Sequence, residues 1–374
     1  MSVSPFPPQV PAQTGAVLFI DLDAIAANWR ALEARQSPAC RAAAVVKADA
    51  YGLGAAPVAA ALAAAGCRRF VVATLDEGLA LRAGRPEAEI LVLSGPLPGT
   101  ASLFAGAGLW PVLNSLEQVA DWRALATRQQ RPLPAALHVD TGMRRLGLSA
   151  ADLARLSADP ALLAGIDPRL LMSHLACADE PEHPLNALQR QRFAAARALF
   201  PGLPGSLAAS SGIFLGPAWH ADWTRPGAAL YGLNPTPGAA NPMAPVARLA
   251  ARILQVRDVD AGDSVGYGAS YRCAAPTRLA IVAAGYADGL FRALGNRGCG
   301  HFGEQPVPLV GRVSMDLTIF DVGIASTARP GDSITLMGPG NDADAIARAA
   351  GTIGYEILTA LGARYHRHYL GGAA

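Results

Sequence analysis

The chain has 374 residues and a formal net charge of only +2, with 51% hydrophobic and 16% charged residues. This composition indicates a globular protein with a large core and excludes a disordered chain. No run of lysine and arginine interleaves with aromatic residues, which argues against nucleic-acid binding. The mean hydropathy is +0.25, but the apolar stretches are interrupted before the roughly 18 residues that a membrane span needs, so we expect no membrane association.

Five cysteines are scattered along the chain without a CxxC pair: Cys40, Cys67, Cys177, Cys273 and Cys299. This pattern predicts reduced thiols, with neither a disulfide framework nor a metal site. The first residues, MSVSPFPPQVPAQTG, have neither the basic nor the apolar region of a secretion signal. We therefore expect a cytoplasmic protein.

From residue 16 to residue 231, apolar runs alternate with helical segments rich in Ala and Leu. Strands are predicted at residues 42–47, 69–74, 89–94, 109–113, 135–140, 169–174, 205–210 and 225–232. Helices are predicted at residues 56–66, 75–84, 115–129 and 186–200. Near-continuous apolar strands are typical of a parallel sheet covered on both faces, and eight of them favour a (β/α)8 barrel. A doubly wound sheet is the alternative; it more often has a glycine-rich phosphate turn after its first strand, which is not found here.

The residue pattern changes after NPTPGAANPMAPVA (234–247), which is rich in Pro, Gly and Asn and is typical of a linker. Beyond it, β-branched, partly alternating segments are separated by turns such as DAGD and RPGD, which predicts a mostly antiparallel β-domain. One or two helices are expected near the end of the chain. We therefore expect a barrel domain at residues 14–240 and a β-domain at residues 241–374, to which residues 1–13 could also belong.

Four of the predicted strands end in polar side chains: Lys47, Asp140, His174 and Ser210. Barrel enzymes carry their chemistry at these carboxyl ends. Lys47 is the most informative, because desolvation opposes a buried ammonium group; a lysine that snorkels from a strand edge is the alternative. A desolvated lysine loses its proton more easily and becomes a nucleophile for Schiff-base chemistry, which pyridoxal 5′-phosphate (PLP) exploits most often.

A PLP site needs further groups, and the sequence offers candidates for each. Ser210, Gly227 and Tyr51 could supply hydroxyl and backbone N–H donors to the phosphate. His174 is placed to lie against the ring. Arginine has no acceptor, so Arg225 would leave the pyridine nitrogen unprotonated, which weakens the electron sink and suits simple proton exchange at an α-carbon. Taken alone, Arg225 would be interpreted as a surface salt-bridge residue.

With these residues in place, the chain resembles the alanine racemases, PLP-dependent enzymes of bacteria, over almost its whole length. The resemblance rests on AVVKADAYGLG (44–54), DTGMRRLG (140–147), SHLACADE (173–180), SSGIFLG (210–216), RPGAALYG (225–232), VGYGASY (265–271), GYADG (285–289) and GRVSMD (311–316). It implies an N-terminal (β/α)8 TIM barrel, a C-terminal β-domain and a head-to-tail homodimer with shared active sites. It also implies interconversion of L-alanine and D-alanine by two-base proton exchange at Cα through a Schiff base, supplying D-alanine for peptidoglycan.

The resemblance implies two catalytic bases. Lys47, joined to the cofactor, would act on one face of Cα, and Tyr267 of the other subunit would act on the opposite face. Tyrosine is a weak base at its ordinary pKa of about 10, so it needs neighbours such as His174 and Arg225. Without the resemblance, Tyr267 would be interpreted as a core or turn residue.

The other site residues are implied in the same way. The cofactor-binding residues would be Lys47, Tyr51, His174, Ser210, Arg225, Gly227, Ala228 and Tyr355. The substrate-binding residues would be Arg145 and Met315, and the entrance residues would be Asp179, Tyr286, Arg292 and Arg312. No metal is implied.

Two positions depart from the family pattern. His138 stands where many relatives carry a lysine, often carbamylated, that steadies the active-site arginine, and Ala209 stands where an asparagine is usual. These departures leave the orientation of Arg145 and the substrate range open. The alternatives are a broader-specificity PLP amino-acid racemase and a non-catalytic PLP-binding protein. A PLP decarboxylase or aldolase is disfavoured by Arg225, and a bare-barrel PLP carrier by the C-terminal domain.

Overall fold

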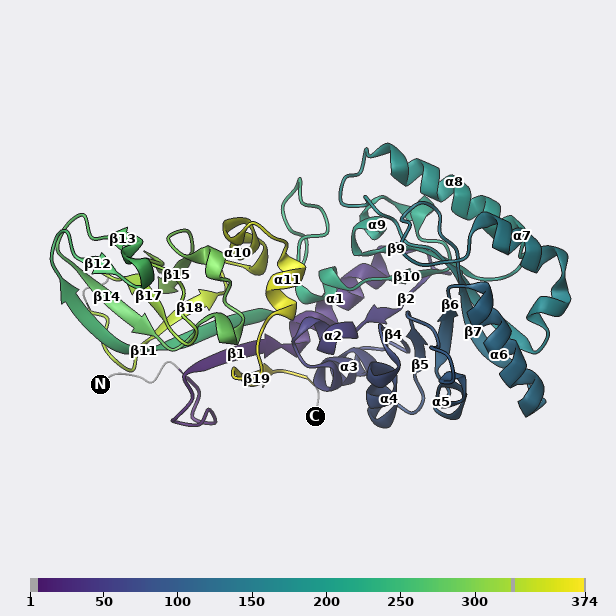
Figure 1. The fold of residues 1–374 in the computed structure, drawn as a ribbon, viewed down its shortest axis with the longest axis horizontal. Coiled ribbons are helices and arrows are strands. Elements are labelled where there is room, and N and C mark those ends of the chain that lie inside the picture. The colour runs from purple at the N-terminus through teal and green to yellow at the C-terminus, as the bar shows by residue number, and fades with distance from the viewer. Residues whose placement is uncertain (1–5, 324–326, 373–374) are drawn as a thin grey trace.

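The computed structural model describes residues 6–323 and 327–372 of the chain. A β/α barrel lies at one end of its long axis and a β-rich domain at the other (Figure 1). The barrel strands are β2 (Arg41–Ala42), β3 (Ala44–Val45), β4 (Arg69–Val72), β5 (Glu89–Val92), β6 (Trp110–Leu113), β7 (Leu133–His138), β8 (Ile166–Met172), β9 (Gly205–Ala209) and β10 (Trp223–Arg225). Neighbours pair in parallel in the order β2-β10-β9-β8-β7-β6-β5-β4-β3.

The barrel closes through residues 41–45. Only Ala43 separates β2 from β3, and its N–H donates to Thr224 O. As a result, one short segment pairs with β10 on one side and with β4 on the other. If β2 and β3 are counted as one interrupted strand, the ring has eight strands, and the prediction of a (β/α)8 barrel is confirmed.

The helices of this half are α1 (Leu22–Ala34), α2 (Lys47–Tyr51), α3 (Ala55–Ala64), α4 (Leu75–Gly84), α5 (Ala101–Gly106), α6 (Leu116–Gln129), α7 (Ala150–Ala158), α8 (Pro184–Ala198) and α9 (Ser210–Phe214). The four helices predicted from the sequence correspond to α3, α4, α6 and α8. Hydroxyl caps start two of them: Thr74 accepts from Glu77 N and Ser115 accepts from Gln118 N. The fully buried Trp122 of α6 contributes to the core with Phe70 of β4.

Most predicted strands extend one or two residues beyond the observed ends, and the errors at the eighth and first strands bear on the site. The eighth strand is predicted at residues 225–232, but β10 ends at Arg225 and a 3₁₀ helix follows at Ala228–Tyr231. Pro226 has no N–H for a sheet ladder, which favours the end of the strand there. The first strand is predicted to run to Lys47, but β3 ends at Val45.

The second sheet is mostly antiparallel, as predicted. Its strands are β1 (Ala16–Asp21), β11 (Ala247–Val259), β14 (Thr277–Val282), β15 (Cys299–Phe302), β16 (Gln305–Pro308), β17 (Thr318–Asp321), β18 (Ser333–Met337) and β19 (His366–Leu370). A separate hairpin joins β12 (Ser264–Val265) to β13 (Tyr271–Arg272), and the helices are α10 (Ala343–Ala350) and α11 (Gly354–Thr359). Among the pairs of the large sheet, β1 and β19 are parallel.

Strand β1 links the two halves of the molecule. It precedes the barrel in the chain, yet it pairs with β11 and β19 in the second sheet. The division at residues 240–241 stays a prediction, and β1 shows that the segment before the barrel contributes to the C-terminal sheet. In the part of the chain that the structure describes, no helix combines the length and the apolar character needed to cross a membrane.

Candidate active site

Lys47 opens a left-handed turn, α2, at the carboxyl end of β3. Ala48, Asp49 and Ala50 have φ of 51–53° and ψ of 48–49°, and Tyr51 has φ of 57°. Left-handed backbone costs about 1–2 kcal/mol per non-glycine residue, so a run of four persists only when its surroundings hold it. Part of that support comes from β19, where Arg367 Nη2 donates to Gly52 O at 2.9 Å.

The amine of Lys47 is partly buried, and its pKa lies below the ordinary value. Burial is the main cause, and the cation of Arg145 adds to it. The carboxylate of Glu77 opposes both effects. A lowered pKa raises the share of uncharged amine at neutral pH, and the uncharged amine is the form that attacks an aldehyde.

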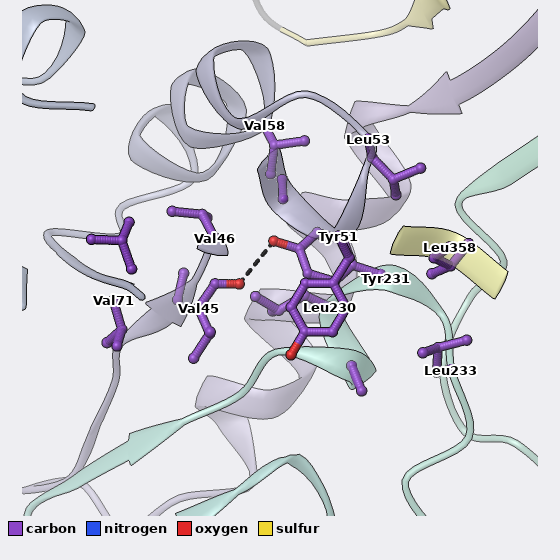
Figure 2. Packing of buried hydrophobic residues seen from close by; sticks show 14 of the residues in the cluster. Val45, Val46, Tyr51, Leu53, Val58, Val71, Leu230, Tyr231, Leu233 and Leu358 are labelled. Carbon is purple, nitrogen blue, oxygen red and sulfur yellow. Dashed lines mark hydrogen bonds between the residues drawn. The ribbon is translucent and has the colours of Figure 1, made fainter. Parts of the chain in front are cut away.

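Three tyrosines stack beside the Lys47 turn. The centroid of the Tyr51 ring lies 4.7 Å from that of the Tyr231 ring, its neighbour in Figure 2. On α11, the Tyr355 ring lies 6.0 Å from the Tyr51 ring. Tyr231 Oη donates to Val45 O at 2.9 Å, which ties the stack to β3. A Cβ built on Gly227 would stand 2.5 Å from Tyr51 Oη. The hydroxyl of Tyr51 is therefore held against the backbone of Gly227.

Ser210 completes a cradle of donors at the start of the 3₁₀ helix Ala228–Tyr231. Its Oγ accepts from Gly227 N at 3.0 Å and from Ala229 N at 3.1 Å. With both acceptor positions used, the hydroxyl proton of Ser210 is left to donate. The Gly227 N–H, expected at the phosphate, is directed to Ser210 Oγ in this structure. The cradle fits a phosphate group, because it presents hydroxyl donors where a side chain at residue 227 would fill the space.

Arg225 is buried, with an exposed fraction of 3%, so its interpretation as a surface salt-bridge residue is wrong. Its guanidinium donates to Ser206 Oγ, Ser173 O and Leu207 O, none of them a carboxylate. Burial lowers its pKa to about 10, so it stays protonated at neutral pH. A buried cation whose hydrogen-bond partners are neutral is not part of a structural ion pair, which points to a role in the site.

Two histidines near these cations are neutral at physiological pH. Burial lowers the pKa of His174 to about 3, and the charges of Arg225, Arg145 and Lys47 add to the effect. Burial also lowers the pKa of His138, to about 4, and the charges of Arg225 and Arg145 add to the effect. Neither imidazole therefore adds positive charge to the site.

The tautomer of His138 follows from its hydrogen bond to Asn114. The Asn114 amide Nδ2 donates to Leu93 O at 3.0 Å and to Val112 O at 2.9 Å, so its Oδ1 is left to accept. His138 Nδ1 lies 2.7 Å from this oxygen and must carry the hydrogen. His138 Nε2 is then an acceptor, and the charge of Arg145 is close enough to depress the His138 pKa.

The barrel mouth does not contain all the residues predicted for the site. It brings together Lys47, Tyr51, Arg145, His174, Ser210, Arg225, Gly227, Ala228 and, from α11 of the same chain, Tyr355. Asp179 also lies on this side of the molecule. Burial is the main cause that raises the pKa of Tyr355, and the negative charge of Asp179 adds to it. The β12–β13 hairpin, which carries Tyr267, lies at the opposite end of the molecule from the barrel (Figure 1).

The remaining predicted residues gather in the C-terminal domain and face solvent. Tyr267 is 71% exposed, and Met315 and Tyr286 are about half exposed. Their loops are joined, because Tyr286 N donates to Ser314 O and Ala287 N to Met315 O, each at 2.9 Å. The Arg312 guanidinium lies against Gly268, beside Tyr267, and the turn that begins at the exposed Arg292 packs against the Arg312 backbone. In a single chain, the residues predicted for one site therefore lie in two separate groups.

Sequence reasoning missed the residues that hold the site from behind. Ser206 and Ser173 orient Arg225, and Asn114 fixes His138. A signal existed for two of them: Asn114 directly follows β6, and Ser206 is a polar residue within the apolar strand β9. Ser173 binds Arg225 through its backbone carbonyl, which no residue pattern marks.

Comparisons with known proteins agree with this geometry. Family models described as alanine racemase N-terminal and C-terminal domains match residues 20–235 and 246–369. The alanine racemase of Rhodospirillum rubrum is 56% identical over 359 residues, which cover 95% of this chain and 96% of that protein. The catabolic alanine racemase of Mesorhizobium japonicum is 50% identical over 364 residues, 96% of this chain and 95% of that protein. A crystal structure of alanine racemase from Bartonella henselae with covalently bound pyridoxal phosphate has a TM-score of 0.92 at 39% identity, over 96% of this chain and 100% of that one. The chain belongs to the alanine racemase family.

Proposed function

We propose that the protein is a PLP-dependent alanine racemase that interconverts L-alanine and D-alanine. The observation that carries the proposal is the barrel mouth, where the low-pKa amine of Lys47 shares one site with the donor cradle at Ser210 and the buried cation of Arg225. The D-alanine produced suits the supply of peptidoglycan precursors.

Bound PLP supplies an electron sink that makes the Cα proton of a bound amino acid acidic. Lys47 Nζ is the amine that would bond the cofactor aldehyde with loss of water. Once the substrate amine has replaced it there, the freed Nζ would take or return a proton on one face of Cα. The hydroxyls of Tyr51, Ser210 and Tyr355 would hold the phosphate together with the backbone at Ala228. Gly227, whose N–H donates to Ser210 Oγ, would contribute by leaving space beside the Tyr51 hydroxyl. His174 is proposed to lie against the ring.

Arg225 sets how strongly the ring withdraws electrons. Placed at the pyridine nitrogen, its guanidinium can donate a hydrogen bond but cannot give up its proton at neutral pH, since its pKa is about 10. The nitrogen would then stay unprotonated and the electron sink would be moderate, which would favour proton exchange at Cα over side reactions. Ser206 Oγ and the Ser173 carbonyl support this role because they accept from the guanidinium and fix its orientation.

We propose a head-to-tail homodimer in which Tyr267 of one subunit completes the barrel mouth of the other. Two observations support it: Tyr267 is 71% exposed, and its hairpin lies at the end of the molecule opposite the barrel. Tyr267 would exchange a proton on the face of Cα opposite Lys47. The racemase needs both bases because a proton removed from one face must be replaced on the other.

Substrate contacts would also come from both subunits. Arg145, exposed at the barrel mouth, is proposed to bind the substrate carboxylate, and Met315 of the partner subunit would offer its backbone N–H. Asp179 on the barrel side, with Tyr286, Arg292 and Arg312 of the partner subunit, would line the entrance. The exposure of all four of these entrance side chains in a single chain supports this arrangement.

The test is circular dichroism of L-alanine solutions incubated with the purified protein and PLP. We expect the signal to decay to zero as the racemate forms, and the Lys47→Ala protein to leave it unchanged. L-Serine and L-lysine serve as comparison substrates, and comparable rates on all three would identify the broader-specificity racemase instead. A PLP-loaded protein that leaves the alanine signal constant would refute racemase activity.

A further inference from the structure

Glu77 connects the turn after Lys47 to the next loop of the barrel. It is partly buried in the first turn of α4, and its carboxylate accepts from three backbone N–H groups. Oε1 accepts from Ala48 N at 2.7 Å, and Oε2 accepts from Ala73 N at 2.7 Å and from Thr74 N at 3.3 Å. One side chain therefore bridges the loops that follow β3 and β4.

The contact of Glu77 with Ala48 lies in the left-handed segment of the backbone. Ala48 is the first left-handed residue after Lys47, with φ of 51° and ψ of 49°. The left-handed run costs about 1–2 kcal/mol per residue, and hydrogen bonds to an ionised acceptor are among the stronger ones that can offset it. An N–H group bound at 2.7 Å by a carboxylate fixes the peptide plane that joins Lys47 to Ala48, and with it the direction in which the Lys47 side chain leaves the backbone.

A helix start of this kind does not by itself require a carboxylate. At the equivalent position of α6 the chain has Gln118, whose Oε1 accepts from Asn114 N at 2.8 Å while its Nε2 donates to Ser94 O and Pro96 O. An amide suffices there because one N–H and two carbonyl groups need partners. At α4 all three partners of the side chain are donors, so both oxygens must accept.

We propose that Glu77 is a positioning residue for Lys47: it holds the left-handed turn so that the amine is presented to the cofactor. The inference rests on the proposed function, in which Lys47 is the amine that bonds PLP. The negative charge of Glu77 also acts on Lys47. It favours the ammonium form, whereas burial and the cation of Arg145 favour the uncharged amine. His174, which is neutral at physiological pH, also lies close enough to the amine for the Lys47 charge to lower its pKa.

The test compares Glu77→Gln with Asp76→Asn in the full-length protein. Asp76 is exposed in the same helical turn, so its substitution removes the same charge from α4 without touching the Lys47 turn. Three measurements are made: PLP affinity from the visible absorbance of the bound cofactor, hydrogen exchange of the peptide that spans residues 47–53, and the pH at which Lys47 of the cofactor-free protein reacts with an amine reagent.

We expect Glu77→Gln to weaken PLP binding about tenfold, as the loss of a hydrogen bond to a charged group predicts. Exchange at Ala48 should accelerate, and the pH midpoint for Lys47 modification should fall, because the carboxylate no longer favours the ammonium form. Glu77→Asp keeps the charge on a shorter side chain, so its pH midpoint should stay near that of the unmodified protein while its affinity falls. Asp76→Asn should match the unmodified protein in all three measurements.

The inference is overturned when Glu77→Gln matches Asp76→Asn in all three measurements. It is also overturned when Glu77→Gln and Glu77→Asp both unfold, since Glu77 then serves only the stability of the barrel. Lys47→Ala separates these results from a failure of the proposed function. If that variant still bonds PLP, the amine has been assigned to the wrong residue, whatever Glu77 does.

Discussion

Gly227 is the position where one added methyl group tests the phosphate cradle. In Gly227→Ala the new Cβ would stand 2.5 Å from Tyr51 Oη and 3.2 Å from its Cζ. Ordinary contact begins at 3.4 Å, so the oxygen must move by about 0.9 Å. The ring cannot simply swing aside, because Tyr51 is only 6% exposed and packs between Tyr231 and Tyr355. We expect the hydrogen bond of Tyr51 to the PLP phosphate to be lost.

A hydrogen bond to a charged group contributes about 1.5–3 kcal/mol, so the dissociation constant for PLP should rise about 10-fold to 150-fold. The assay is a titration of the cofactor-free protein with PLP, followed by visible absorbance. Gly238→Ala is the matched control, because a Cβ there meets nothing within 4 Å. Equal PLP affinity in the two variants would refute the assignment of Tyr51 and Gly227 to the phosphate.

Three further predictions follow from the buried polar groups and the exposed base. The pKa of His138 is about 4 in the folded chain and 6.5 ordinarily, so its contribution of about 3 kcal/mol to stability is complete above pH 6.5 and is lost as the pH falls toward 4. The melting temperature of His138→Gln should therefore fall less steeply over that pH range than that of the unmodified protein. Equal slopes would contradict the low pKa of His138. Ser206→Ala removes an acceptor from buried Arg225 and should lower the free energy of unfolding in urea by about 1–3 kcal/mol, whereas Ser157→Ala, at an exposed contact, should change it less. Tyr267→Phe should keep PLP bound and slow exchange of the α-proton of L-alanine into deuterated water more than that of D-alanine; equal slowing of the two exchanges would contradict its place on one face of Cα.

The barrel was predictable because its signals are local. Apolar runs alternate with Ala/Leu-rich segments, and hydroxyl caps such as Thr74 and Ser115 mark where helices begin. The parallel pairing of β1 with β19 could not be predicted from the sequence, because it joins residues 16–21 to residues 366–370 and no local pattern encodes so distant a contact. The end of the eighth strand at Arg225 could have been foreseen from Pro226.

The candidate site divides in the same way. Lys47, His174 and Ser210 stand out in the sequence because polar residues at the ends of apolar strands are unusual. The left-handed turn after Lys47 does not stand out in the sequence, because KADAY consists largely of residues that form ordinary right-handed helix. Contacts from distant segments hold this backbone in the left-handed conformation. The burial of Arg225 likewise depends on acceptors that β8 and β9 bring together.

Co-expression of two inactive variants tests the shared site most directly. Lys47→Ala lacks the amine but keeps Tyr267, and Tyr267→Phe lacks the phenol but keeps Lys47. If each site combines Lys47 of one subunit with Tyr267 of the other, random pairing gives mixed dimers with one intact site of two, and about a quarter of the full racemase activity should return. If both bases came from one chain, no mixed dimer would hold an intact site, and activity that stays at the level of the separate variants would contradict the account.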